Sequence, residues 1–226
     1  MNIIYEDNHI IVVEKPPGVL SQKDKTGDDS IIEIIKDYIK VKYNKPGNVF
    51  LGSVHRLDRP TGGVMVFAKT SKALTRLNNT MKSDGFNKKY YAIVEGVIEQ
   101  GGGELVHYLV KNTQKNIVSA YKKEQPGSKK AILKFNTIGI LNGLTLVDID
   151  LKTGRSHQIR TQLREEFYPI VGDKKYGSKT VLKDKSICLH SYNLSFIHPV
   201  KKELMSFNAF PDFNNQYWKI FANLIE

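Results

Sequence analysis

Short apolar runs separated by polar turns predict a chain rich in β-strands. The first two runs, Ile3–Tyr5 and Ile10–Glu14, flank an Asp7-Asn8 turn, and Lys15-Pro16-Pro17-Gly18 then breaks the chain. Further strands are predicted at Val49–Val54, Gly63–Ala68, Lys89–Val94, Glu104–Val110, Ile117–Tyr121, Ala131–Ile140, Leu144–Leu151 and Leu189–Ile197. Asn142-Gly143, the strongest short hairpin signal, joins two of these runs as an antiparallel pair.

Four segments predict helices. Ser30 and Glu33 have the spacing of a capping box, and the helix that follows is expected to end near Lys42, before Pro46. The other helices are predicted after Thr70 and up to Gly85, from near Ser156 to before Pro169, and at Tyr217–Leu224 with Trp218. Many strands with few helices predict an α+β fold with a largely antiparallel sheet, and 226 residues fit a single domain.

Composition narrows the classes of partner and compartment. The net charge of +11 and a pI of about 9.5 favour an anionic partner, nucleic acid first, over a merely solubilising charge. The single cysteine, Cys188, excludes an internal disulfide framework and multi-cysteine metal sites. An acidic start without a signal-peptide pattern, and no apolar run of membrane-spanning length, predict a cytoplasmic protein without membrane contact.

The segment Lys111–Lys130 carries Pro126, Gly127 and six lysines. It is the one candidate for a flexible region. Two interpretations stay open from the sequence, because such a segment fits both a solvated loop and a mobile arm that grips phosphate.

The arginines are concentrated in two short stretches. Only six of the 34 basic residues are arginine, yet five of them lie within 55–63 and 153–164. Because the guanidinium fork binds carboxylate and phosphate in a bidentate way that lysine cannot reproduce, the clustering predicts two parts of one anion-handling site. The sixth, Arg76, is interpreted as a surface helix residue.

The first stretch, His55–Gly63, holds one carboxylate, Asp58, between Arg56 and Arg59. Without a second carboxylate nearby, the stretch gives no local support for a two-carboxylate glycosidase. Out of context, an aspartate beside arginines is most often a structural ion pair. The pattern does not form a nucleotide-binding phosphate loop either, because Ala68 stands where that motif requires glycine.

The second stretch places His157, Arg160 and Arg164 on one helix face, with Ile159 and Leu163 toward the core. Gly154 and Arg155 precede the helix, where backbone N–H groups attract anions. No metal-binding histidine pattern occurs, so we expect no metal site. The residues alone indicate an enzyme of RNA or DNA with a carboxylate nucleophile or base.

Several motifs, in order along nearly the whole chain, resemble the RluA-type RNA pseudouridine synthases. His55-Arg56-Leu57-Asp58-Arg59-Pro60-Thr61-Gly62-Gly63 closely resembles their signature motif. The other matching segments are Asp7–Gly18, Lys88–Ala92, Gly154–Arg160, Gly172–Gly177 and Leu189–Pro199. Many relatives carry an N-terminal S4 RNA-binding domain. Here the catalytic domain is expected to fill residues 1–226 without one.

This resemblance implies the pseudouridine synthase fold, with a bent, mixed and largely antiparallel sheet, flanking helices and a central RNA-binding cleft. It implies isomerisation of flipped uridines in ribosomal RNA, transfer RNA or both, by a monomer without cofactor or metal. Asp58 is then the catalytic aspartate, Tyr90 the active-site tyrosine, and Arg160 the arginine that pairs with Asp58. The side chains expected to contact RNA are Arg56, Arg59, Arg155, His157 and Arg164, although His157 could equally cap its helix.

Two other functions remain open from the sequence. One is a non-catalytic protein that binds or remodels RNA on the same fold. The other is a hydrolytic glycosylase that uses Asp58 on a flipped base in DNA and releases the free base. Whether Asp58 attacks the sugar or removes a ribose proton is also open.

Overall fold

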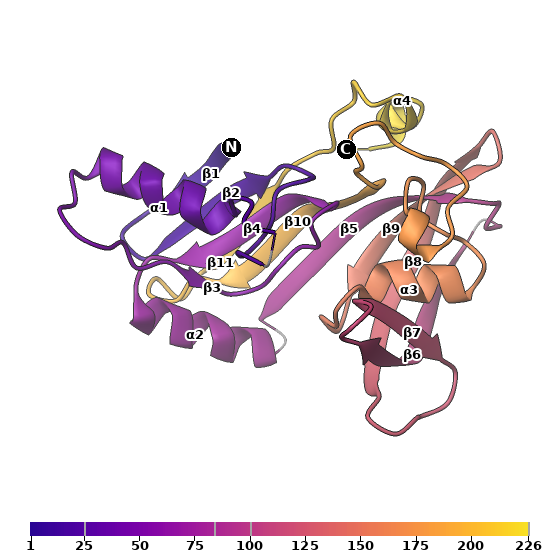
Figure 1. The fold of residues 1–226 in the computed structure, drawn as a ribbon, viewed down its shortest axis with the longest axis horizontal. Helices are drawn as coiled ribbons and strands as arrows, with labels where there is room; N and C mark the ends of the chain where they lie inside the picture. The colour runs from indigo at the N-terminus through magenta and orange to yellow at the C-terminus, as the bar shows by residue number, and fades with distance from the viewer. Residues whose placement is uncertain (25, 84, 100, 226) are drawn as a thin grey trace. The chain divides into compact units, whose positions relative to one another are not determined.

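The computed structural model describes residues 1–24, 26–83, 85–99 and 101–225. It consists of two compact units (Figure 1). The first unit comprises Met1–Asn87 and Tyr192–Ala209, and the second comprises Lys88–Ser191 and Phe210–Glu226. The chain passes between the units three times, within β5 (Phe86–Glu95), within β10 (Leu189–Ile197) and between Ala209 and Phe210. The single domain expected from chain length stays a prediction.

Antiparallel strands form the sheet of the first unit. β1 (Asn2–Glu6) pairs with β2 (Ile10–Lys15), which pairs with β4 (Gly62–Ala68), and β3 (Gly52–Ser53) also pairs with β4. β11 (Leu204–Asn208) pairs with β10. Side chains of these strands and of one helix form a shared core that includes Val12, Val66, Leu77, Leu194 and Phe196. This unit thus buries a continuous apolar layer against its sheet.

Two helices belong to the first unit (Figure 1). α2 (Ser71–Lys82) begins as expected after Thr70, whose hydroxyl accepts a hydrogen bond from the Ala73 N–H at 3.1 Å. α1 (Ile31–Lys42) also has the expected bounds, but the capping box is wrong. The Ser30 hydroxyl bonds to the carboxylate of Glu33 and makes no cap bond to the backbone.

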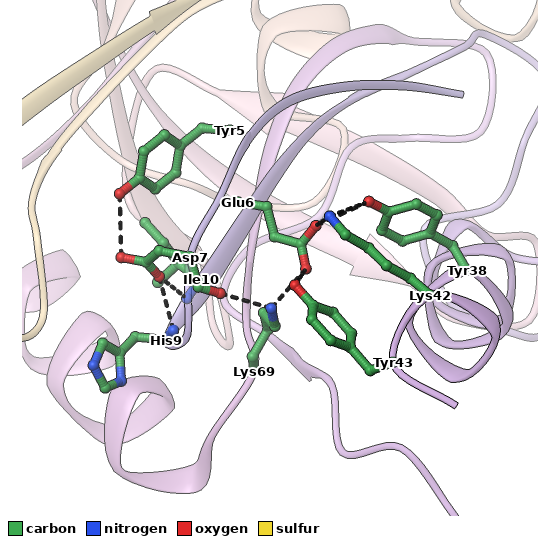
Figure 2. Close-up of polar contacts among 9 residues, drawn as sticks. All are labelled: Tyr5, Glu6, Asp7, His9, Ile10, Tyr38, Lys42, Tyr43 and Lys69. Atoms are coloured by element: carbon green, nitrogen blue, oxygen red, sulfur yellow. Dashed lines mark hydrogen bonds and ion pairs between the residues drawn. The ribbon is translucent and has the colours of Figure 1, made fainter. Parts of the chain in front are cut away.

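A polar cluster around Glu6 fixes α1 to the β1–β2 hairpin (Figure 2). The Glu6 carboxylate lies 2.7 Å from the Lys42 ammonium and 2.6 Å from that of Lys69, just after β4. The hydroxyls of Tyr38 and Tyr43 donate hydrogen bonds to the same carboxylate. Burial alone would raise the pKa of Glu6, but these donors outweigh it and lower the pKa to about 2.

The second unit contains an antiparallel sheet in the spatial order β5, β9 (Leu144–Leu151), β8 (Lys129–Leu141), β6 (Gly102–Asn112) and β7 (Ile117–Tyr121). Asn142 and Gly143 have φ of 53° and 73°, which confirms the tight hairpin between β8 and β9. α3 (Gln158–Glu165) and the 3₁₀ turn η1 (Lys174–Tyr176) belong to this unit (Figure 1). The α+β class and the largely antiparallel sheet are confirmed.

The structure differs from the expected elements in three places. Only Gly52–Ser53 pairs as a strand within Val49–Val54, although Val49, Leu51 and Val54 are buried. The expected helix at Tyr217–Leu224 is split into α4 (Gln216–Lys219) and the 3₁₀ turn η2 (Ala222–Leu224). β11 was not anticipated, because its five residues mix apolar and polar side chains and only Met205 and Phe207 are partly buried. Apolar runs therefore indicated burial more reliably than they indicated pairing.

The basic segment Lys111–Lys130 is not one long loop. It includes the end of β6, the whole of β7 and the start of β8. Only 113–116 and 122–128 lie between these strands.

Candidate functional site

Asp58 lies in the first unit, in the extended segment that leads into β4. The side chains alternate here: Leu57 is 5% exposed and buried in the core, whereas Arg56 is exposed and Asp58 is half-buried. The carbonyl of Asp58 accepts a hydrogen bond from the Thr61 N–H at 3.0 Å, which closes a turn. This geometry anchors the segment to the core through Leu57, and Asp58 keeps part of its surface exposed.

The loop after β2 holds the main chain on both sides of Asp58. The Ser21 hydroxyl donates to the Leu57 carbonyl at 2.6 Å and accepts from the Leu57 N–H at 3.1 Å. The Gly18 N–H donates to the Arg59 carbonyl at 2.8 Å. Gly18 has a φ of 87°, a conformation that favours glycine. Because both neighbours of Asp58 are bonded to this loop, the position of the Asp58 backbone depends on it.

Lys15, at the end of β2, also holds the loop and the turn in place through hydrogen bonds from its side chain. Its side chain is fully buried, and its ammonium donates to the carbonyls of Pro16 at 2.9 Å, Val19 at 2.8 Å and Arg59 at 3.3 Å. Burial lowers the pKa of Lys15 to about 7, while the nearby negative charge of Asp58 acts in the opposite direction. The ammonium thus cross-links the loop after β2 to the turn that carries Asp58.

Arg59 has partners other than Asp58 within this unit. Its guanidinium lies 2.7 Å from the Asp28 carboxylate and donates from Nε to the Gly18 carbonyl at 2.9 Å. Both members of the Arg59–Asp28 pair are about half exposed, so the pair contributes little to stability. The RNA contacts expected of Arg56 and Arg59 stay predictions.

Tyr90 lies in the second unit, on β5, where it is opposite Ile149 of β9. Its side chain is 5% exposed. Lys88 lies two residues earlier on the same face of β5, and burial lowers the pKa of its ammonium. A Cβ atom at Gly154 would lie 3.3 Å from the Lys88 Nζ, so glycine at this position lets the main chain approach the lysine.

Arg160 forms a bidentate ion pair inside the second unit. From α3, its Nε donates to Asp173 Oδ2 at 2.7 Å and its Nη2 to Asp173 Oδ1 at 2.8 Å. The two side chains are 6% and 1% exposed. The guanidinium also lies 5.0 Å from the ring centre of Tyr176, in cation–π geometry. The fork that the sequence led us to expect is therefore used here on Asp173, and the pairing of Arg160 with Asp58 stays a prediction.

His157 is fixed by Tyr176. The His157 Nδ1 lies 2.7 Å from the Tyr176 hydroxyl, and this hydroxyl accepts the N–H of Val118 at 3.0 Å. His157 is the residue before α3, with a φ of 51°, and its side chain makes no cap bond. Of the two roles left open for His157, the structure thus shows no side-chain capping. Its RNA contact stays a prediction.

The helix start is occupied by groups of the chain itself. The Gln158 side-chain oxygen accepts the Arg155 N–H at 3.0 Å and the Thr153 hydroxyl at 2.8 Å. Arg155 is exposed and donates from Nε to the Lys130 carbonyl at 3.0 Å. Arg164 is 59% exposed and has only the neighbouring Glu165 carboxylate at 3.4 Å as an ion-pair partner among the described residues. These exposed guanidiniums remain accessible to an anionic ligand.

The described residues do not form a metal site, and they include neither a reactive cysteine nor a membrane-spanning helix. No group of three or more His, Cys, Asp or Glu residues suited to a metal ion occurs among them. Cys188 is buried, and burial raises the pKa of its thiol. None of the helices in the described part of the chain is long and apolar enough to cross a bilayer.

Four residues of these arrangements were missed from the sequence. Lys15 was interpreted only as part of a chain break, and Ser21 was not singled out. Asp173 and Tyr176 belong to a segment that carried the family resemblance, but without an assigned role. The sequence signal that could have identified Lys15 is its place two residues after the apolar run Ile10–Val13, in the same strand.

Comparison with known proteins identifies the family. Residues 9–165 match the family model described as RNA pseudouridylate synthase. The chain is 33% identical over 217 residues to the dual-specificity RNA pseudouridine synthase RluA of Haemophilus influenzae, with 94% of each protein covered. It is 35% identical over 211 residues to the ribosomal large subunit pseudouridine synthase C of Buchnera aphidicola, covering 89% of this chain and 64% of that relative.

The fold agrees with this assignment. The structure of the human RNA pseudouridylate synthase domain containing 4 superposes with a TM-score of 0.80 at 21% identity, covering all of this chain and 94% of that one. The human RNA pseudouridylate synthase domain containing 1 gives a TM-score of 0.71 at 20% identity over 94% of this chain. The resemblance inferred from the motifs is confirmed: the chain belongs to the RNA pseudouridylate synthase family.

Proposed function

We propose that this protein converts specific uridines of ribosomal RNA, transfer RNA or both into pseudouridine. In this isomerisation the N1–C1′ bond of the nucleoside breaks and a C5–C1′ bond forms, while C5 loses a proton and N1 gains one. Relatives of this chain include enzymes named for the large ribosomal subunit, for transfer RNA and for dual specificity. The family match over residues 9–165 is the observation that carries the proposal.

We assign the catalytic role to Asp58. It is half-buried on a turn whose main chain is held by Ser21 and Lys15. An ionised carboxylate in this position can act either as a nucleophile on the ribose or as a base, and the proposal includes both. The buried side chain of Lys15 lies close enough to Asp58 that the negative charge of Asp58 acts to raise the pKa of Lys15.

Tyr90 and Arg160 complete the proposed machinery. The ring of Tyr90 lies against the flipped uracil, and Arg160 pairs with Asp58 and fixes its rotamer. The buried bidentate contact with Asp173 supports this role, because it holds the Arg160 guanidinium in one orientation. The base must leave the helical stack to reach these groups.

Exposed cations supply the RNA affinity in this proposal. Arg56, Arg59, Arg155 and Arg164 are all exposed and can contact phosphates, and we assign the same role to His157. The net charge of +11 supports a polyanionic substrate. We place the protein in the cytoplasm, as a monomer.

The direct test is to incubate the purified protein with transcribed ribosomal and transfer RNA that carry tritium at C5 of uridine. Pseudouridine formation releases this tritium to water and leaves the RNA mass otherwise unchanged. Release together with pseudouridine in the digested RNA supports the proposal. RNA binding without release would support the non-catalytic alternative, and free base released from DNA in a parallel incubation would support a glycosylase.

A further inference from the structure

The second unit contains an open pocket of about 380 Å³ between β7, α3 and η1. One wall is the whole of β7 (Ile117–Tyr121). The opposite wall consists of side chains from α3 and η1, namely Thr161, Arg164, Glu165, Lys175 and Tyr176. None of the catalytic assignments above uses this pocket.

β7 is the last strand in the order of this sheet, so within the described part of the second unit one of its edges has no strand partner. Residues of an antiparallel strand alternate between bonding the neighbouring strand and pointing away from it. At Val118 the outward N–H donates to the Tyr176 hydroxyl, and the outward carbonyl accepts the Thr161 hydroxyl at 2.9 Å. The backbone N–H and carbonyl of Val118 therefore point away from β6, and both are hydrogen-bonded to side chains.

The backbone N–H and carbonyl of Ala120 point the same way as those of Val118, because Ala120 lies two residues further along the same strand. No described residue caps its outward N–H or carbonyl as Tyr176 and Thr161 cap those of Val118. Ala120 is nevertheless 7% exposed and lines the pocket. The pocket thus presents one backbone donor and one backbone acceptor that a ligand can satisfy.

The side chains around Ala120 add positive charge and an aromatic face. Arg164 is 59% exposed, Lys175 is exposed, and the single carboxylate is that of Glu165, which lies 3.4 Å from Arg164. The Lys175 ammonium is oriented by the Asn116 carbonyl at 3.2 Å. Tyr121 exposes 41% of its surface at the end of the strand. A cationic pair, an N–H donor, an acceptor and an exposed ring correspond to the phosphate, the 2′-hydroxyl and the base of a ribonucleotide.

We propose that this pocket binds a ribonucleotide of the RNA substrate other than the target uridine. Lys175, Arg164 and the Ala120 N–H hold its phosphate. The Ala120 carbonyl accepts its 2′-hydroxyl, and its base stacks on Tyr121. The inference rests on the proposed function for the nature of the substrate, and it makes the β7 edge a determinant of which RNA is bound.

The test uses the full chain and a fluorescent twelve-nucleotide oligouridylate, with binding followed by anisotropy at several salt concentrations. We expect Tyr121→Ala to weaken binding about tenfold, and Tyr121→Phe to retain it within about twofold because the ring stays. Lys175→Ala is expected to weaken binding and to reduce the slope of log affinity against log salt by about 0.7. Lys134→Ala is the matched control, because it removes one exposed positive charge from β8, outside the pocket. It should leave both quantities unchanged.

The role of Ala120 has its own readout. In protein labelled with [¹⁵N]alanine, the Ala120 amide resonance, identified by its loss in Ala120→Ser, should shift on addition of the oligouridylate. The 2′-deoxy counterpart should bind more weakly than the RNA. An unmoved Ala120 resonance at saturation, or equal affinity for the two oligonucleotides, would overturn the assignment.

Failure of the inference is separable from failure of the proposed function. If pseudouridine forms but Tyr121→Ala and Lys175→Ala bind RNA as well as the unaltered protein, the pocket does not bind RNA, and an extended peptide paired with β7 becomes the alternative occupant. If no pseudouridine forms while both variants lose affinity, the pocket assignment holds and the enzymatic proposal fails.

Discussion

The buried ammonium of Lys15 donates a hydrogen bond to the main-chain carbonyl of Arg59, with nitrogen and oxygen 3.3 Å apart. The residue that follows Asp58 is thereby tied to the end of β2, more than forty positions earlier in the chain. Two further carbonyls share the same ammonium. The segment that carries the proposed catalytic aspartate therefore depends on a side chain that is remote from it in sequence.

Lys15→Met tests this dependence. Methionine fills similar space but leaves three carbonyl groups without their buried donor. We expect the free energy of unfolding at pH 8 to fall by about 2 kcal/mol. Urea denaturation measures the change, and Lys134→Ala serves as the control for the loss of a surface charge. Unchanged stability would mean that hydrogen bonds from the Lys15 side chain do not hold the turn.

The pH dependence of stability provides a second measure of Lys15. Its pKa is about 7 in the folded protein and near 10.5 when solvated, so between these values the unfolded state binds more protons. Stability of the unaltered protein should therefore rise with pH from about 7 to 10 relative to Lys15→Met. The quantity to plot is the difference between the two proteins. A difference that stays constant over this range would contradict the lowered pKa.

Glu6→Gln tests the cluster shown in Figure 2. Glutamine keeps the shape but removes the charge that Lys42 and Lys69 neutralise, and we expect a loss of about 2 kcal/mol at pH 7. The pKa of Glu6 is lowered to about 2 in the folded protein, so its contribution is complete above about pH 4.5 and disappears as the pH falls toward 2. Denaturation at pH 7, 4 and 2.5 should show the free energies of unfolding of the two proteins converging as the pH falls. A constant difference between them would contradict the lowered pKa of Glu6.

Arg160→Lys separates charge from geometry. Lysine retains the positive charge but cannot reach both oxygens of Asp173 at once. We expect at least a tenfold loss of kcat for pseudouridine formation. Because the pair is buried, we also expect a lower melting temperature. Turnover close to that of the unaltered enzyme would show that the guanidinium fork does not orient the catalytic group.

Phe167 offers a test of backbone strain. It follows α3 with a φ of 69°, and its side chain is 89% exposed. Hydrogen bonds from Phe167 to the Arg164 carbonyl and from Tyr168 to the Leu163 carbonyl form a helix-ending motif in which glycine is the usual residue. Phe167→Gly should therefore raise the free energy of unfolding by about 1 kcal/mol. Phe167→Ala removes the ring but keeps a side chain in the left-handed conformation, so it should not raise the free energy of unfolding. Equal gains in both variants would contradict backbone strain as the cause.

Most of the architecture could be predicted because the spacing of apolar residues and the choice of turn residues are local properties of the sequence. The β8–β9 hairpin followed from Asn142-Gly143, and α2 followed from Thr70 and the spacing after it. Pairing partners are not local, and so β11 was missed and the strand at Val49–Val54 shrank to two residues. The capping box failed because Ser30 and Glu33 satisfy each other instead of the helix backbone.

Sequence reasoning singled out candidate site residues where the choice of residue was unusual for this chain. Arginines in a lysine-rich chain identified Arg160 and its surroundings, and the motif resemblance identified Asp58. The partner of Arg160 was not predictable, because Asp173 is one acidic residue among 23 and only the fold brings it to α3. Lys15 was missed for a similar reason, since a lysine at a strand end is usually solvated.

The central claim is that the carboxylate of Asp58 performs the chemistry. The most direct measurement is the pseudouridine content of substrate RNA after incubation with Asp58→Asn, alongside the affinity of this variant for the same RNA. We predict no pseudouridine above background and only a modest fall in affinity. Pseudouridine at the level of the unaltered enzyme, from a variant that mass spectrometry shows has not deamidated to aspartate, would contradict the claim.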